Sequence, residues 1–131
     1  MVVLIDSNIY IGLIRQQKDV RFVLREWIGS GDLLSCGVIR AKVIRGVRSL
    51  KIRNDLMDMF DVLPEVSIDS KLWRDTTDLA WQLDRRGIVL PLVDLVIAAC
   101  ALRAYATLIS EDTHFAHVPH LKVRKDLPRY S

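Results

Sequence analysis

The sequence predicts a single α/β domain over residues 1–131, with a mainly parallel sheet of four to five strands flanked by helices on both faces. Short apolar runs rich in β-branched residues alternate with longer amphipathic segments along the whole chain, which is the pattern of βα units. A chain of 131 residues corresponds to one domain and is long enough to bury a proper core. No linker, internal repeat or low-complexity segment divides it.

The candidate strands are apolar runs at 1–5, 33–36 and 107–109, with short strands also expected near 62–64 and 121–123. The first run is apolar without alternation, which is typical of a strand buried on both faces of a parallel sheet. In such folds the functional site lies at the carboxyl ends of the strands. The polar residues that follow each strand are therefore the candidates for function.

Apolar residues at helical spacing predict the helices between these strands. The first helix follows Asp6 and turns Ile9 and Leu13 inward, and Asp19 caps a second one that ends near Gly31. Further helices are expected at 38–50, through 56–60, at 70–86 and at 93–102. The last of these is apolar almost all round, which indicates a central, buried helix.

Charge is distributed unevenly along the chain. The net charge of +3 is mild and does not by itself indicate a nucleic-acid partner. A stretch between residues 40 and 53, however, carries six basic residues and no acidic one. It is either the solvated face of a helix or a surface that suits a phosphate polymer, with Arg40, Arg45 and Arg48 as candidate phosphate contacts.

The two cysteines and the apolar segments indicate a cytoplasmic protein. Cys36 and Cys100 lie in apolar surroundings and belong to no metal-binding spacing, so we expect buried free thiols in a reducing compartment. The N-terminal apolar run lacks the features of a signal peptide. Pro91 and Asp94 interrupt the longest apolar stretch, which is too short to span a bilayer, so no membrane association is expected.

Three aspartates stand where the strand ends are expected to converge. Asp6 directly follows the first strand, and Asp112 follows the strand at 107–109. Asp94 begins the most apolar helix and is the only charge between Gly87 and Arg103. Taken singly, each carboxylate could be a helix cap or could be stabilised by the positive end of its own helix. Together they indicate a site for a hard divalent cation such as Mg²⁺ or Mn²⁺, which can activate water for phosphodiester hydrolysis.

Four segments, in order along nearly the whole chain, resemble the motifs of PIN-domain ribonucleases of the VapC toxin type. They are Leu4–Asn8, Val38–Gly46, Leu92–Ala99 and Ser110–Phe115. The resemblance implies a Mg²⁺- or Mn²⁺-dependent endoribonuclease that acts on RNA as the toxin of a type II toxin–antitoxin pair. It also implies a homodimer that is silenced by a cognate antitoxin protein.

The same resemblance implies roles for individual residues. Asp6, Asp94 and Asp112 would be the catalytic, metal-binding carboxylates, and Ser7 would hydrogen-bond within the site. We expect His114 to pack or hydrogen-bond near Asp112, with a general-base role as a secondary possibility.

Lys42 departs from the family pattern, which has Glu at this position. A lysine removes an oxygen ligand and brings a positive charge to the cation's place, so we expect weaker metal binding and reduced hydrolysis. Three explanations remain open: a detoxifying substitution, a naturally inactive relative, or an ammonium that partly stands in for the metal. Glu111 is a poor substitute ligand, because strand alternation directs it away from Asp112.

Other signals favour weaker alternatives. His114, His117 and His120 are spaced by three, but Pro119 breaks any helix that would align them as a zinc site. The tryptophans at 27, 73 and 81 are core or interface anchors, or else platforms for RNA bases. A phospho-acceptor receiver domain would need an acidic pair after the first strand, where only Asp6 is present. A non-catalytic module that binds RNA or an antitoxin is the main alternative.

Overall fold

A four-stranded parallel sheet forms the centre of the computed structural model, which describes residues 1–131. The strands are β1 (Val3–Ile5), β2 (Leu33–Leu34), β3 (Thr107–Ile109) and β4 (Val123–Arg124), in the spatial order β2-β1-β3-β4. All three neighbouring pairs are parallel, which confirms the predicted sheet. The short strand expected near 62–64 is wrong: the helix there continues to Val62, and only a single bridge joins Glu65 to Ser35.

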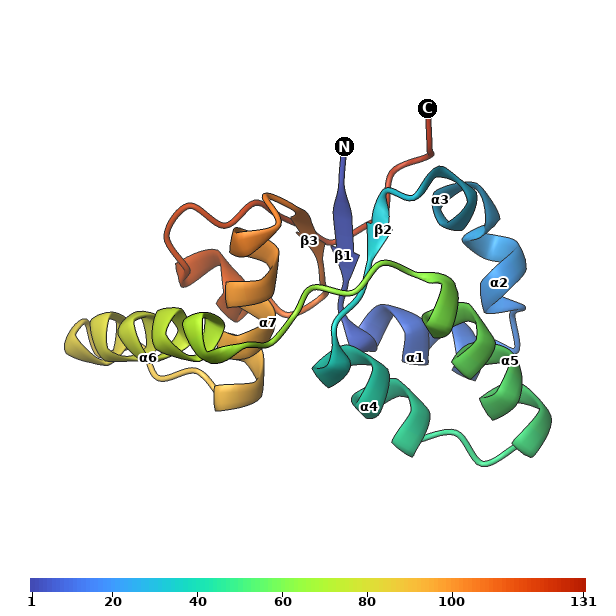
Figure 1. Cartoon of the computed structure of the whole chain (residues 1–131), viewed down its shortest axis with the longest axis horizontal. Coiled ribbons are helices and arrows are strands. Elements are labelled where there is room, and N and C mark those ends of the chain that lie inside the picture. The colour runs from blue at the N-terminus through green and yellow to red at the C-terminus, as the bar shows by residue number, and fades with distance from the viewer.

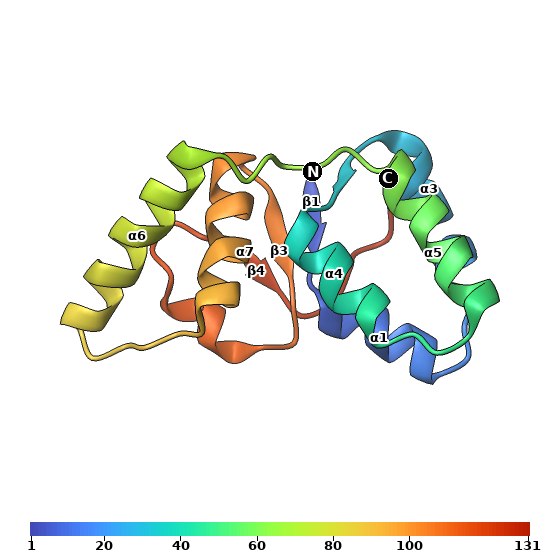
Figure 2. The ribbon, with the colours of Figure 1, turned by 60° about the horizontal axis from the view of Figure 1, so that its bottom comes forward.

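Both faces of the sheet are covered. All three residues of β1 are fully buried, and successive side chains of a strand point to opposite faces. Figures 1 and 2 show α6 and α7 on the β3 side of the sheet and α1, α2, α3 and α5 on the β2 side, with α4 between the two groups, where it contacts α7, α1 and α5. The two termini lie near each other at the same end of the molecule (Figure 1).

The N-terminal helices begin at the capping residues that the sequence indicates. Helix α1 (Ser7–Arg15) starts after Asp6, and α2 (Val20–Val23) starts after Asp19, whose carboxylate accepts the Phe22 N–H at 3.3 Å. The second expected helix is divided at Leu24, and α3 (Arg25–Ser30) follows it. Gly31 ends α3 in the left-handed conformation, with φ 80°, where a residue without Cβ is favoured.

The helix expected over 38–50 ends earlier than its apolar pattern predicts. Helix α4 spans Gly37–Arg45, and α5 spans Leu50–Val62 after Ser49, whose hydroxyl accepts the N–H of Ile52 at 3.3 Å. Ile39 and Val43 are buried as expected, whereas Leu50 is 70% exposed. The cap at Ser49 starts a new helix axis, so the inward stripe of α4 does not continue beyond Val47.

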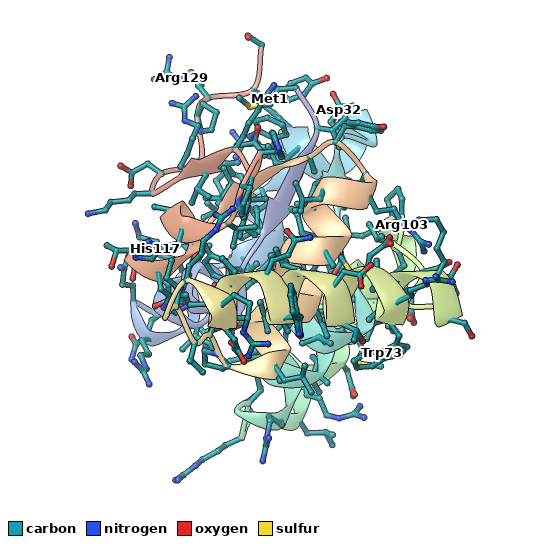
Figure 3. All side chains as sticks on the ribbon, turned by 90° about the vertical axis from the view of Figure 1, so that its left-hand side faces the viewer. Met1, Asp32, Trp73, Arg103, His117 and Arg129 are labelled. Carbon is teal, nitrogen blue, oxygen red and sulfur yellow. The ribbon has the colours of Figure 1, made fainter.

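Helices α6 (Ser70–Arg85) and α7 (Leu92–Arg103) pack against each other. Figure 3 looks onto α6 where it lies across α7, with Arg103 near the beginning of α6. There the Arg103 guanidinium lies 2.9 Å from the carboxylate of Asp69, the N-cap of α6. Gly87 follows α6 with φ 77°. Eight residues of α7 are buried, which confirms the predicted central helix.

The tryptophans and cysteines divide between core and surface. Trp27 is buried, whereas Trp73 and Trp81 are 46% and 60% exposed on α6. Cys36 and Cys100 are both buried free thiols, as predicted. No helix of the structure has the length and apolar character that a membrane crossing requires.

Candidate functional site

The candidate site begins where β1 and β3 end side by side. Ile5 pairs with Ile109, and the backbone N–H of Asp6 donates to the Ile109 carbonyl at 2.9 Å. The residues that follow the two strands, Asp6 and Ser110, are therefore neighbours, although they lie 104 positions apart in the chain. The Ser110 hydroxyl donates to Asp6 Oδ2 at 2.8 Å.

Asp6 is buried, with 1% of its surface exposed, and both of its carboxylate oxygens are engaged. Oδ1 accepts the Ser7 backbone N–H at 2.7 Å, and the Ser7 hydroxyl lies 3.4 Å from the same atom. Oδ2 accepts the Ser110 hydroxyl. These hydrogen bonds compensate for the burial of a charged group and hold its side chain in one orientation.

Ser110 connects Asp6 to the loop that carries Asp112. Its hydroxyl oxygen accepts the Asp112 backbone N–H at 3.1 Å and the Asn8 amide at 3.3 Å. The Asn8 carbonyl oxygen in turn lies 3.5 Å from the N–H of the exposed Glu111. Sequence reasoning missed Ser110 and Asn8 as site residues. Their signal was available, because Ser110 follows β3 just as Asp6 follows β1.

Asp94 reaches the same place from the first turn of α7. Only 6% of its surface is exposed, and its Oδ2 lies 2.9 Å from Nε2 of His114. His114 belongs to the 3₁₀ helix Thr113–His117 that follows Asp112. Figure 2 shows the beginning of α7 beside the turn that follows β3. The Nε2 atom is buried, and the Asp94 carboxylate is the polar group that lies against it.

Asp94, Asp112 and His114 each offer one donor atom within 4.8 Å of the other two. Asp6 is not part of this set, and its oxygens accept hydrogen bonds from Ser7 and Ser110. His114 lies near Asp112, as expected, with ligand atoms of the two within 4.8 Å, and Nε2 of His114 also contacts Asp94. Two carboxylate oxygens and an imidazole nitrogen at this spacing fit the ligands that divalent cations use in proteins.

The electrostatics of the site centre on Asp94. Burial is the largest cause that raises the pKa of Asp94, and the negative charge of Asp6 acts in the same direction. The nearby charges of His114 and Lys42 oppose this rise. Lys42 is half-buried on α4, which packs against α7. The positive charge of Lys42 therefore acts on the carboxylate of Asp94 in the first turn of α7.

The three candidate phosphate contacts differ in their surroundings. Arg40 lies 2.7 Å from Asp61 and 3.8 Å from Glu65, so acidic partners already neutralise its charge. Arg45 and Arg48 are exposed near the end of α4. A role for Arg40 in binding phosphate would require it to release these partners, because a paired guanidinium contributes little further attraction.

Comparisons with known proteins identify the fold. The sequence profile of the PIN domain matches residues 3–121. No curated protein sequence matches the chain.

Solved structures with the same fold include the following three complexes. The VapBC complex from Salmonella typhimurium, solved bound to DNA, superposes with a TM-score of 0.77 at 16% identity, covering 95% of this chain and 97% of that chain. VapBC2 from Rickettsia felis, bound to a DNA fragment from its promoter, gives 0.72 at 21% identity, with coverage of 95% and 98%. A toxin–antitoxin complex from Klebsiella pneumoniae gives 0.63 at 20% identity, with coverage of 91% and 94%. With the profile matching residues 3–121 and the fold agreeing over nearly the whole length, this chain belongs to the PIN domain family.

Proposed function

We propose that this chain is a metal-dependent endoribonuclease toxin of the VapC type, impaired by Lys42. The observation that carries the proposal is the meeting of Asp94, Asp112 and His114 within 4.8 Å, next to the buried Asp6. Repulsion among these carboxylates is relieved when a cation binds between them, and nucleases use such a cation. The toxin–antitoxin complexes that share the fold support the same reading.

Some residues of the site would bind the metal ion, and others would orient these ligands. Asp94 and Asp112 would hold a Mg²⁺ or Mn²⁺ ion, which when bound polarises a phosphoryl oxygen and lowers the pKa of a bound water. Asp6 would add negative charge and orient the Asp112 loop through Ser110. Ser7 would keep Asp6 in its orientation. The exposed Arg45 and Arg48 would attract the RNA backbone.

Lys42 is expected to weaken both metal binding and cleavage. Its positive charge acts on Asp94, where a cation would have to bind. Lys42→Glu removes that charge and adds an oxygen ligand, so we expect at least a tenfold gain in cleavage of structured RNA with Mg²⁺ or Mn²⁺ (about 10- to 100-fold is usual for groups that tune a metal site). Lys42→Met is the matched control for loss of the charge alone.

The assay includes a triple variant in which Asp6, Asp94 and Asp112 are all replaced by Asn. Cleavage by Lys42→Glu and none by the triple variant is the expected result. If Lys42→Glu is as inert as the triple variant in both metals, the nuclease proposal fails.

The second candidate function is a non-catalytic module that binds RNA or an antitoxin. The observation that favours it is the positive charge of Lys42 beside Asp94, because this charge opposes binding of the cation that catalysis would need. In this case RNA binding, followed by fluorescence anisotropy, would persist in EDTA, and no cleavage would appear before or after the Lys42→Glu change. A loss of RNA binding in EDTA would count against it.

The proposed partners are RNA, a cognate antitoxin protein and a second copy of this chain. The antitoxin is supported by the complexes that share the fold. The homodimer is supported by the exposed Trp73 and Trp81 on α6, with Trp73 labelled in Figure 3. Sedimentation of the purified protein measures the oligomeric state. We propose a cytoplasmic location, which suits the two free thiols.

A further inference from the structure

We propose that His114 is the third metal ligand of this site, and that the mixed set of two carboxylates and one imidazole selects a first-row transition-metal cation over Mg²⁺. The inference rests on the proposed function in one respect, namely that the same site binds a divalent cation. It goes further because it names a nitrogen ligand and the class of metal that this ligand prefers. The resemblance to PIN nucleases assigned only carboxylates to this site.

The spacing of the donor atoms supports this assignment. Nε2 of His114 lies 2.9 Å from Oδ2 of Asp94. Two ligand atoms bound at a right angle about 2.1 Å from one metal ion are about 3 Å apart. A donor atom of Asp112 completes the set within 4.8 Å, a separation that a small side-chain shift reduces to ligand spacing. The three donors therefore lie close enough for one ion to bind all of them after such a shift.

The hydrogen bonds of the site hold Asp6 more firmly than the other three groups. Both oxygens of Asp6 accept hydrogen bonds, from Ser7 and Ser110, which fix the orientation of this carboxylate and use part of its capacity to bind a cation. The Asp112 loop is anchored through its backbone N–H, which leaves the exposed carboxylate without a partner. Nε2 of His114 is buried, and the Asp94 oxygen 2.9 Å away is the polar group against it. A cation bound by both atoms would take the place of this direct contact.

Lys42 makes the nitrogen ligand matter in this chain. At the position where the family carries a carboxylate, the site has a cation that acts on Asp94. Mg²⁺ depends on several hard oxygen ligands, so it loses most from this change. An imidazole is a good ligand for Zn²⁺, and along the first transition row the affinity of a site with nitrogen and oxygen ligands rises from Mn²⁺ to Co²⁺. Mn²⁺ prefers oxygen ligands but accepts an imidazole more readily than Mg²⁺ does. His114 thus compensates for the missing oxygen, but only for metals that accept nitrogen.

The test measures metal binding directly and does not require RNA cleavage. The full-length protein, stripped with EDTA, is titrated with Mg²⁺, Mn²⁺ and Co²⁺ by calorimetry. The variants are His114→Gln and, as a matched control, His117→Gln, which changes an exposed histidine of the same 3₁₀ helix. Circular dichroism and thermal unfolding show whether each variant folds.

We expect the unaltered chain to bind Mn²⁺ and Co²⁺ at least tenfold more tightly than Mg²⁺. His114→Gln should lose at least tenfold in Mn²⁺ and Co²⁺ affinity and change Mg²⁺ affinity by less than threefold, while His117→Gln should match the unaltered chain. A second measurement uses the unaltered chain only: Zn²⁺ should shift the ¹⁵N resonance of Nε2 of His114 and leave that of His117 in place.

Equal Mn²⁺ affinities for His114→Gln and the unaltered chain would overturn the inference, as would an unshifted His114 resonance or the absence of any metal binding. The two proposals fail separately. RNA cleavage by Lys42→Glu with no role for His114 in metal binding would overturn only this inference. Metal binding through His114 without any cleavage would overturn only the nuclease proposal.

Discussion

Asp6 and Asp112 both follow strands that are adjacent and parallel, Asp6 directly after β1 and Asp112 three residues after the end of β3, yet their surroundings are opposite. Asp6 is 1% exposed, and hydrogen bonds from Ser7 and Ser110 occupy both of its oxygens. Asp112 is exposed, and only its backbone N–H is held, by Ser110. One aspartate is built into the structure, whereas the other presents a free carboxylate at the surface.

The difference shows that position after a strand does not by itself define the role of an aspartate. A buried carboxylate must have its charge compensated by donors, and these donors fix its orientation and use part of its lone pairs. An exposed carboxylate stays hydrated and can exchange water for a cation. Ser110 links the two cases, since it donates to Asp6 and accepts from Asp112.

The largest effect is expected from Asp6→Ala, for which Asp112→Ala is the comparison. Asp6→Ala leaves the Ser7 N–H and the Ser110 hydroxyl without their acceptor in a buried site, so we expect a loss of about 2 kcal/mol in the free energy of unfolding. Asp112→Ala should change it by no more than about 0.5 kcal/mol, as is usual at the surface. Urea unfolding of the metal-free proteins measures both values. Equal losses for the two variants would contradict the proposed division of roles.

A smaller effect is expected for Ser110→Ala, which removes the link between the two aspartates. The variant loses the hydrogen bond to Asp6 and releases the N–H of Asp112, so we expect a loss of about 1 kcal/mol in the free energy of unfolding. The loop after β3 should also become more mobile, which amide hydrogen exchange of residues 111–114 would detect. Ser67→Ala, at an exposed loop position, is the control. Unchanged exchange in that loop would show that Ser110 does not hold it.

The smallest effect concerns pH. Burial raises the pKa of Asp94 in the folded chain above its ordinary value. In the pH range between those two values the folded state holds a proton that the unfolded state has lost, so stability falls as the pH rises through that range. Asp94→Asn removes this dependence, and its stability relative to the unaltered chain should increase from acid to neutral pH. A stability difference that stays constant with pH, in EDTA, would contradict the raised pKa.

Much of the fold could be predicted because it depends on local patterns. The apolar run before Asp6 predicted β1, and the lone charge of Asp94 in an apolar segment marked the beginning of α7. Capping residues such as Asp19 and Asp69 mark helix starts through bonds to N–H groups three residues away. The expected helix over 38–50 failed for a local reason too, because the cap at Ser49 outweighed the apolar spacing.

The sequence predicted which aspartates belong to the candidate site, but it did not predict the contacts that each residue makes there. Asp6, Asp94 and Asp112 were selected from the sequence, and the structure brings Asp94 and Asp112 together. The neutralisation of Arg40 by Asp61 depends on a contact between α4 and α5, which no spacing along the chain reveals. The contact of His114 with Asp94 likewise joins a 3₁₀ helix to the first turn of α7. Their roles as catalytic and metal-binding residues remain predictions.

The sequence by itself determined the order of strands and helices, the burial of α7 and the presence of acidic residues after the strands, because these features follow from hydrophobic periodicity and capping over a few residues. Only the tertiary structure decided which oxygens are occupied and which are free. That choice depends on donors far away in the chain, such as Ser110 for Asp6, and hydrogen-bond partners at such separation leave no periodic signal in the sequence.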